Sequence, residues 1–584
     1  MYSRVMFIAA VLAVLLPGHI WTYQLTILHT NDVHARFEEF NKYGGRCTES
    51  LSQKGECFGG VARQMSKVRE IRETNDNVIF LNAGDYYQGT FMYTVHKWKI
   101  VADFMNRLGH DAMALGNHEF DDGVEGLLPF LENVNFPVLG CNIDVDEVPL
   151  LKGKILSSIE RDVGGEKIGI IGYVTPDTSF LASPGNVSFK TESDCLKEQA
   201  EQLHSKGIKI IIALGHSGFR RDLEIARSIP YLDVVVGGHT DTFLYTGNPP
   251  SIEKPQGKYP VVIDKDDGSK TLVVQDYTYG KYLGFLRVKF TDDGKVQSWT
   301  GNPILLDEKV EEDPLIQNAL KPYVEEVEKI SKEVVGKSRV LLLGERSTCR
   351  MRECNMGNML TDAVVSEFTK MPRDRGWTSV SVALWNSGGI RSSIDERYAD
   401  GNITMEDLMN VIPFACIFLI VELKGSDLIT AMEEAVENYD VTGVDPPGAF
   451  LQVSGMKIRY NLKKNPGERV EKILIKCSNC RVPKYFPLNT TSYYKVAIPD
   501  FIYNKGDGFK TFMEKSTSVI STGLEDSDII KSYLRTSSPL VVGVEDRISF
   551  QDENRCLKST NFQSSNRKVN TLLIILSVIY SYLR

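Results

Sequence analysis

The first half of the chain repeats one pattern, in which a short apolar run is followed at once by a polar cluster. The apolar runs are 25–29, 78–81, 112–115, 208–214 and 234–236. Apolar residues at helical spacing lie between some of these runs, for example at Val61, Met65, Val68 and Ile71. Strands that alternate with helices predict a layered α/β domain, and functional side chains in such domains lie where strands end. The pattern continues to about Pro303.

A helical stretch separates this part from the rest of the chain. Asp313 and Pro314 suit the N-cap and the first position of a helix. One face then carries apolar residues at helical spacing: Ile316, Leu320, Val324, Val327 and Ile330. Pro322 predicts a kink or a restart within this helix. We predict an α/β (α+β) chain with a layered N-terminal domain over 23–312, a helical linker over 313–335 and a second, mixed α/β domain over 336–548.

The first 22 residues have the features of a secretory signal. Arg4 supplies a positive charge, and residues 5–16 form an apolar core that is too short to span a bilayer. Pro17 and Gly18 end that core. We therefore predict a signal peptide over 1–22 and an extracellular protein. A buried N-terminal helix is the alternative.

The other end of the chain carries a second apolar run, 569–583, directly after Arg567 and Lys568. A polar stretch rich in small residues precedes it. Small residues, a polar spacer and an apolar tail form the pattern of a GPI-anchor signal, whose tail is removed. We predict a polar spacer and anchor signal over 549–584, and hence a protein held at the cell membrane by a lipid. A transmembrane anchor and a secreted form released by proteolysis are the alternatives.

Composition narrows the function classes. The chain has 584 residues, of which 42% are hydrophobic and 24% charged; this excludes a disordered chain, a coiled coil and a polytopic membrane protein. With a net charge of −9, the chain lacks the excess of basic residues that is typical of nucleic-acid-binding proteins. We therefore expect no nucleic acid partner. Three sequons, at Asn186, Asn402 and Asn489, predict a glycoprotein if the chain is exported.

Cysteine spacing agrees with an oxidising compartment. Ten cysteines are too few to build the fold by disulfides, but close neighbours favour local bridges. We predict three of them: Cys47–Cys57, Cys349–Cys354 and Cys477–Cys480. Half of a zinc site or a redox pair is the alternative for the last, although the chain has no second Cys-x-x-Cys. The sequence leaves four cysteines without assigned partners: Cys141, Cys195, Cys416 and Cys556.

The polar clusters that follow the predicted strands carry metal-ligand side chains. They are Asp32-x-His34, Gly84-Asp85, Gly116-Asn117-His118-Glu119, Gly215-His216 and Gly237-Gly238-His239. Glycine lets the backbone turn sharply, so side chains from separate strand ends can converge. Two carboxylates, three imidazoles and one amide suit two divalent ions of zinc type, with one aspartate bridging them about 3.5–4 Å apart. A lone histidine is more often structural, but five such clusters in order favour a metal centre.

The order of these clusters resembles that of the calcineurin-like metallophosphoesterases. Longer strings are similar to the animal ecto-5′-nucleotidase and apyrase family. In the first domain they are HTNDVH (29–34), NAGDYYQGT (82–90), DAMALGNHEFDDGVEG (111–126), ALGHSGF (213–219) and VVVGGH (234–239). In the second domain they are CRMRECNMGN (349–358), NSGGIRSSIDER (386–397) and KGDGF (505–509). The similarity covers nearly the whole chain.

The resemblance implies a role for each matching residue of the first domain. The implied metal ligands are Asp32, His34, Asp85, Asn117, His216 and His239, with Asp85 bridging two divalent ions, which the family implies to be zinc. His118 and Asp121 form the implied catalytic pair, in which the imidazole meets the developing negative charge and the carboxylate orients it. Water activated by the two ions attacks phosphorus in line, and no covalent enzyme intermediate is needed.

The resemblance also implies a nucleotide pocket in the second domain. The implied substrate-binding residues are Arg350, Asn386, Arg391, Phe414, Phe501 and Asp507. In this scheme the arginines bind phosphate or ribose oxygens, Asn386 the base and Asp507 the ribose, while the two phenylalanines stack on the base. From the residues alone, the alternatives are core packing for the phenylalanines and surface ion pairs for the arginines. Because metals and base belong to different domains, catalysis requires domain closure.

The implied function is that of an extracellular 5′-nucleotidase that hydrolyses nucleoside 5′-monophosphates, AMP above all, as a homodimer through the second domain. One alternative is an apyrase that hydrolyses extracellular ATP and ADP. Another is an integrin-binding platelet antagonist, because Lys505-Gly506-Asp507 spells a tripeptide of some integrin-binding loops. Relatives place Asn or Gln two residues after the last metal histidine, whereas this chain has Asp241. A carboxylate there can bind one ion directly and shift the metal preference.

Overall fold

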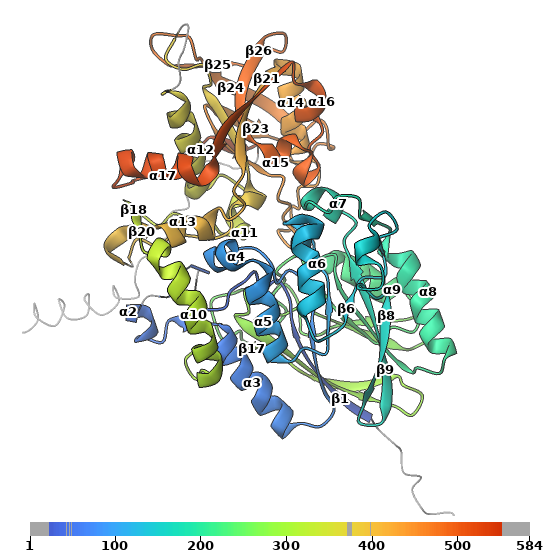
Figure 1. The fold of residues 1–584 in the computed structure, drawn as a ribbon. Helices are drawn as coiled ribbons and strands as arrows, with labels where there is room; N and C mark the ends of the chain where they lie inside the picture. Colours follow the sequence, from blue (N-terminus) through green and yellow to red (C-terminus); the bar gives the residue numbers. More distant parts are fainter. Residues whose placement is uncertain are drawn as a thin grey trace, which may run out of the picture.

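The structure is a computed structural model that describes residues 23–551, except 43, 46, 48, 371–375 and 398. The predicted signal peptide and nearly all of the predicted spacer and anchor signal lie outside these residues. Among the residues that are described, we find no helix with the length and apolar character of a bilayer-spanning segment. Figure 1 shows two lobes, an N-terminal one in blue to green and a C-terminal one in yellow to red.

The N-terminal lobe is built on two mixed sheets. The first runs in the order β16 (Val296–Gly301), β15 (Tyr282–Phe290), β1 (Tyr23–Thr30), β4 (Val78–Asn82), β5 (Ala112–Ala114) and β6 (Val138–Leu139), with β17 (Ile304–Leu305) paired to β15. The second runs in the order β13 (Val261–Asp264), β14 (Lys270–Val274), β12 (Val234–Val236), β11 (Ile210–His216), β9 (Glu166–Val174) and β8 (Ser158–Val163). Strands β1, β4, β5 and β6 are parallel, as are β9, β11, β12 and β14. All five predicted apolar runs form strands, so that prediction is confirmed.

The two sheets pack on one another through a shared apolar core. Leu25 and Ile27 of β1 belong to the same buried cluster as Ile170 of β9 and Ile212 of β11. Helices α8 (Glu192–Ser205) and α9 (Phe219–Ser228) add to this core. A second core lies between the first sheet and α3 (Val61–Thr74), α5 (Trp98–Leu108) and α6 (Gly123–Asn133). The predicted helix at Val61 is confirmed, and the strands are buried on both faces, which explains their continuous apolar runs.

The predicted linker contains α10 (Pro314–Ser331), which lies at the junction of the lobes (Figure 1). Oδ1 of Asp313 accepts the backbone N–H groups of Leu315 and Ile316 at 2.9 and 3.0 Å, which confirms the predicted N-cap. The helix continues through Pro322 and does not restart there, because its buried apolar face holds it against the N-terminal lobe. It contacts α3 and α4 (Phe91–His96) of that lobe and α13 (Met405–Val411) of the other.

The C-terminal lobe has a central five-stranded sheet and a smaller one. The central sheet runs β22 (Leu451–Ser454), β19 (Val382–Asn386), β26 (Tyr493–Pro499), β21 (Ile417–Lys424) and β27 (Ser518–Glu525). The smaller sheet runs β25 (Tyr485–Pro487), β24 (Val470–Lys476), β23 (Met456–Tyr460) and β28 (Ile548–Phe550). Helices α12 (Asn355–Phe368) and α17 (Asp526–Ser537) share a core with one face of the central sheet. Its other face packs on α14 (Gly425–Glu434) and the smaller sheet, as a mixed α/β domain should.

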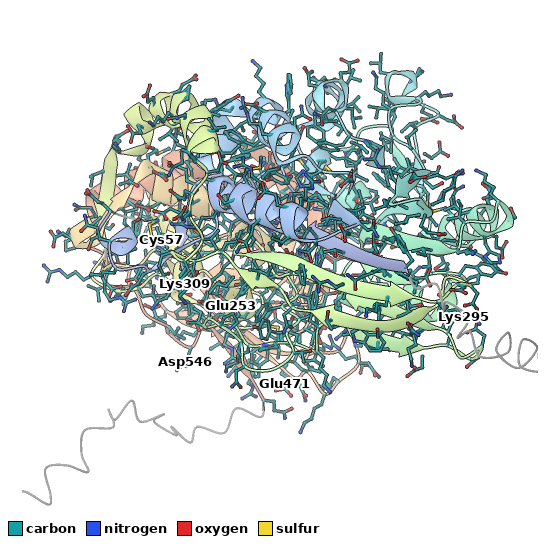
Figure 2. All side chains as sticks on the ribbon, turned by 90° about the horizontal axis from the view of Figure 1, so that it is seen from below. Cys57, Glu253, Lys295, Lys309, Glu471 and Asp546 are labelled. Carbon is teal, nitrogen blue, oxygen red and sulfur yellow. A yellow bond between two sulfur atoms is a disulfide. The ribbon has the colours of Figure 1, made fainter. Side chains whose placement is uncertain are left out.

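Four disulfides are present in the described residues. Cys47–Cys57, Cys349–Cys354 and Cys477–Cys480 are the three predicted bridges, and Figure 2 labels Cys57. The fourth joins Cys141 to Cys195, a pair 54 residues apart in sequence that the spacing had left open. Cys416 is a free cysteine, and Cys556 lies outside the described residues.

Candidate metal centre and nucleotide pocket

The ends of five strands bring the predicted metal ligands together. Those ligands are Asp32 and His34 after β1, Asp85 after β4, Asn117 after β5, His216 at the end of β11 and His239 after β12. Ligand atoms of Asp85, His216 and His239 lie within 4.8 Å of one another. The same holds for Asp32, His34 and Asp241, and for His34, Asp85 and His118. The sequence-based expectation that these loops meet is therefore fulfilled.

Asp85 lies at the centre of this cluster. Its Oδ2 is 2.8 Å from Nε2 of His216 and 4.0 Å from Nε2 of His118. The same His216 nitrogen is 3.8 Å from Oδ1 of Asp32. Asn117 joins the cluster through Oδ1, which lies 2.9 Å from Nδ1 of His239. Nε2 of His34 is 3.9 Å from Oδ1 of Asp32, and His239 shares a group of ligand atoms with Asp85 and His216, so all six predicted ligands are connected.

The backbone of several ligands adopts the left-handed conformation. The φ angle is 50° at Asp32, 49° at His34, 55° at Asp85 and 79° at His239. Such conformations cost non-glycine residues about 1–3 kcal/mol each and collect at functional sites. Gly116 leaves room for the cluster, because a Cβ there would lie 2.2 Å from Oδ1 of Asp85. These backbone conformations lower the stability of the fold, but they direct the side chains toward one another.

Hydrogen bonds to the backbone orient the histidine rings. Nδ1 of His216 lies 2.7 Å from the carbonyl oxygen of Ala83. Nδ1 of His34 lies 3.3 Å from that of Tyr87. A carbonyl only accepts, so each Nδ1 carries the proton and each ring turns Nε2 toward the cluster.

The Glu119 carboxylate holds the loop that carries Asp85. It accepts the backbone N–H groups of Asp85 and Gly116 at 3.0 and 2.7 Å, and those of Tyr86 and Tyr87 at 2.7 and 3.0 Å. Glu119 is fully buried. Sequence reasoning placed it in a polar cluster but assigned it no role. The sequence did contain a signal, because Glu119 lies beside apolar runs that form buried strands. A buried carboxylate needs several hydrogen-bond donors.

Burial and close opposite charges shift the pKa values in the cluster. Burial alone would raise the pKa of Asp85, but the imidazoles of His216 and His118 hold it well below its ordinary value. Burial lowers the pKa of His216, but Asp85 and Asp32 outweigh it and raise that pKa to about 10. A buried site that concentrates carboxylates and imidazoles in this way has the electrostatic character of a cation site.

Two buried atoms show how the donor set fits metal ions. Nε2 of His216 and Oδ1 of Asp241 have no hydrogen-bond partner of acceptable geometry among the described residues. Both residues belong to groups of converging ligand atoms. Carboxylate oxygens and imidazole nitrogens are the ligands that divalent transition ions accept, and Asp85 belongs to more than one group. The residues present therefore fit a centre of divalent metal ions.

His118 and Asp121 form the predicted pair beside this centre. Nδ1 of His118 lies 2.7 Å from Oδ2 of Asp121. Burial lowers the pKa of His118, but the carboxylates of Asp121 and Asp85 outweigh it and raise that pKa. Nε2 of His118 remains directed toward the metal cluster, 4.0 Å from Asp85. The imidazole is thus oriented by one carboxylate and able to meet an anion with a positive charge.

Two predicted pocket residues of the C-terminal lobe contact the cluster directly. Nη2 of Arg391 is 3.1 Å from Nε2 of His34. The ring of Phe414 stacks on that of His118, with centroids 5.8 Å apart. The Arg391 guanidinium also lies 5.7 Å from the centroid of the Phe414 ring. The two lobes therefore meet at the metal centre.

Three further predicted residues lie near Arg391 in the C-terminal lobe. Nδ2 of Asn386 donates to Oδ2 of Asp507 at 2.7 Å, across 121 residues of sequence. The Asp507 backbone has a φ of 54°, in a short turn. Arg350 is buried and donates to the carbonyl oxygen of Pro446 at 3.4 Å. Burial, with Arg346 and Arg391 nearby, lowers the pKa of Arg350 to about 9. Guanidinium groups crowded in this way favour an anionic ligand.

Phe501 borders the same turn. It lies in α15 (Asp500–Tyr503) and packs partly on the C-terminal core. A Cβ at Gly506 would lie 2.6 Å from its ring, so the ring rests against the residue that precedes Asp507. Lys505 is exposed, but Asp507 is half-buried and hydrogen-bonded to Asn386. The Lys505-Gly506-Asp507 tripeptide is therefore not an exposed loop tip.

Comparisons with known proteins agree with a division of the chain into two lobes. A model of calcineurin-like phosphoesterases matches residues 25–242, and one of the 5′-nucleotidase C-terminal domain matches 334–514. A 5′-nucleotidase of Bos taurus is 44% identical over 92% of this chain and 92% of that protein. A snake venom 5′-nucleotidase of Naja atra is 44% identical over 91% of this chain and 99% of that protein.

The chain belongs to the 5′-nucleotidase family. The crystal structure of a 5′-nucleotidase precursor from Thermus thermophilus has a TM-score of 0.83 to it, with 34% identity over 91% of this chain and all of that one. As a 5′-nucleotidase with a calcineurin-like phosphoesterase domain, the protein is a metal-dependent phosphoric ester hydrolase. The predicted family and fold class are confirmed.

Proposed function

We propose that this 5′-nucleotidase is an extracellular enzyme that hydrolyses nucleoside 5′-monophosphates, with AMP favoured, to nucleoside and phosphate. One observation carries the proposal. Arg391 and Phe414, which lie with Asn386 and Asp507 in the C-terminal lobe, contact His34 and His118 of the metal cluster. A site that places polar and aromatic groups next to a phosphoesterase centre suits a nucleotide whose phosphate is terminal.

The metal centre provides the phosphate end of the proposed site. Asp32, His34, Asp85, Asn117, His216 and His239 would hold two divalent ions, which we propose to be zinc. When bound, such a pair supplies Lewis-acid chemistry that activates water and stabilises charge on phosphate oxygens. Imidazole and carboxylate donors of this kind support zinc. Metal analysis of the purified enzyme tests this identity.

His118 and Asp121 act on the phosphate in this scheme. Asp121 holds the imidazole by the 2.7 Å contact at Nδ1, so Nε2 is left to donate toward a phosphoryl oxygen. A positive imidazole there stabilises the charge that develops on the phosphoryl group and the leaving oxygen. The reaction needs no covalent bond between enzyme and phosphate.

The C-terminal lobe holds the nucleoside. Arg350 and Arg391 bind phosphate or ribose oxygens, which a planar guanidinium suits. Asn386 contacts the base, Asp507 accepts from ribose hydroxyls, and Phe414 and Phe501 stack on the base. The hydrogen bond between Asn386 and Asp507 supports this assignment, because it fixes the two side chains as one surface.

We further propose export, a lipid anchor and a dimer. The proposed units are a signal peptide over 1–22, a phosphoesterase domain over 23–312, a linker over 313–335, a nucleotide-binding domain over 336–548 and an anchor signal over 549–584. Four disulfides support an oxidising compartment. Exposed apolar side chains of the C-terminal lobe, among them Phe486, Tyr493 and Ile520, support a homodimer through that lobe. Release by a phosphatidylinositol-specific phospholipase tests the anchor, and light scattering tests the dimer.

A chromatographic time course with ATP, ADP and AMP tests the proposed function. We expect AMP to be converted to adenosine and phosphate while ATP and ADP persist. Consumption of ATP and ADP with accumulation of AMP would instead identify an apyrase.

A further inference from the structure

Arg346 is a side chain of the C-terminal lobe that reaches into the metal cluster of the other lobe. It begins α11 (Arg346–Cys349), which lies at the junction of the lobes in Figure 1. Its Nη1 donates to Oδ2 of Asp241 at 2.8 Å and to the carbonyl oxygen of His239 at 3.2 Å. One nitrogen thus contacts both a carboxylate of the cluster and the backbone of a proposed metal ligand.

Asp241 brings a third carboxylate to the centre, beside Asp32 and Asp85. Its ligand atom lies within 4.8 Å of those of Asp32 and His34. Its Oδ1 is buried and has no hydrogen-bond partner among the described residues. Its Oδ2 accepts from Nη1 of Arg346, so the carboxylate forms an ion pair with a side chain of the other lobe. This ion pair lies beside the converging ligand atoms, close to where a phosphate has to bind.

The Asp241–Arg346 pair is shielded from water. The exposed fraction is 16% for the Asp241 side chain and 21% for that of Arg346. Nη2 of Arg346 is also 3.7 Å from Oδ1 of Asp445, a residue of its own lobe. A second ion pair between the lobes, Arg220 with Asp440 at 2.6 Å, has an Arg220 side chain that is 54% exposed. Solvent therefore screens the ion pair of Arg346 less than that of Arg220.

We propose that Arg346 is a positioning residue that compensates the charge of Asp241 from the other lobe and thereby supports phosphate binding at the metal centre. Its charge compensates that of Asp241, and its second hydrogen bond holds the His239 loop. Without that compensation, the carboxylate of Asp241 disfavours a phosphate group in the site. The inference rests on the proposed function for the identity of the substrate alone.

A double-mutant cycle that reads phosphate binding tests the proposal. Inorganic phosphate is titrated by calorimetry into the metal-loaded wild type, Arg346→Gln, Asp241→Asn and the double variant. We expect Arg346→Gln to weaken binding about tenfold or more, because it leaves the Asp241 charge uncompensated. In the Asp241→Asn background the same change should cost less than about threefold, which is the coupling expected of a direct pair.

Two variants and one independent assay complete the experiment. Arg352→Gln removes the same charge from an exposed side chain and should leave phosphate binding unchanged. Arg346→Lys keeps the charge and should recover much of the lost affinity. Elemental analysis of each variant separates loss of metal from loss of phosphate. An equal cost of Arg346→Gln in both Asp241 backgrounds, at unchanged metal content, would overturn the proposal. An enzyme that accumulates AMP would refute the proposed function, while the cycle would still report on Arg346.

Discussion

The two lobes build their parts of the site in different ways. In the N-terminal lobe, the metal cluster is fixed by its own surroundings, since Glu119 accepts four backbone N–H groups and His216 donates to Ala83. In the C-terminal lobe, Arg391 and Phe414 meet that cluster through single contacts across the junction. The N-terminal half of the site is therefore preorganised, whereas the C-terminal half is completed by the arrangement of the lobes.

The preorganised half should fail completely when its central ligand is changed. Asp85→Asn is expected to lower AMP hydrolysis more than about a thousandfold and to release metal, because Asp85 belongs to more than one group of ligand atoms. Turnover and metal content are measured together. Asp76→Asn, on an exposed side chain, is the control and should retain both. Near-normal turnover of Asp85→Asn would contradict its shared role.

A substitution at Glu119, which supports the loop of a metal ligand, should have an intermediate effect on metal affinity. Glu119→Gln keeps the shape but places an N–H donor among backbone N–H groups, so the loop of Asp85 loses an acceptor. We expect metal affinity to fall about 10–100-fold, as for other residues that support metal ligands. Competition with a chelator measures this affinity. The matched variant Glu125→Gln is exposed and should show no change; an equal loss there would refute the role of Glu119.

The C-terminal half should fail selectively. Phe414→Ala is expected to raise KM for AMP roughly 5- to 150-fold, which corresponds to the loss of about 1–3 kcal/mol of stacking. The rate of hydrolysis of a phosphate ester without a base or other ring should change less than about twofold. Substitutions that remove no contact with the substrate usually have effects of this small size. Steady-state kinetics on both substrates separate these cases. The same loss on both would mean that Phe414 supports His118 and not the base.

The smallest effect is expected at the surface of the junction. Arg220→Gln removes the ion pair with Asp440, but the arginine is exposed and such pairs contribute little. We expect KM for AMP to change less than about twofold. A large increase would mean that exposed charges, and not the buried contacts at the metal centre, hold the lobes together.

The difference between the lobes also decides what the sequence could predict. Asp32, Asp85 and His216 follow apolar strands and are typical metal ligands, so both their position and their chemistry are readable. Phe414 and Phe501 have the sequence character of core residues, and only a family resemblance suggested another role. The contact of Asn386 with Asp507 spans 121 residues and depends on how the C-terminal sheet brings distant loops together. The pairing of Arg346 with Asp241 depends in addition on the arrangement of the lobes.

Metal content and activity of one preparation test the central claim most directly. The account predicts two divalent ions per chain in active protein, loss of AMP hydrolysis when a chelator removes them, and recovery when they are restored. Turnover that persists in protein shown by elemental analysis to be free of transition metal would contradict it.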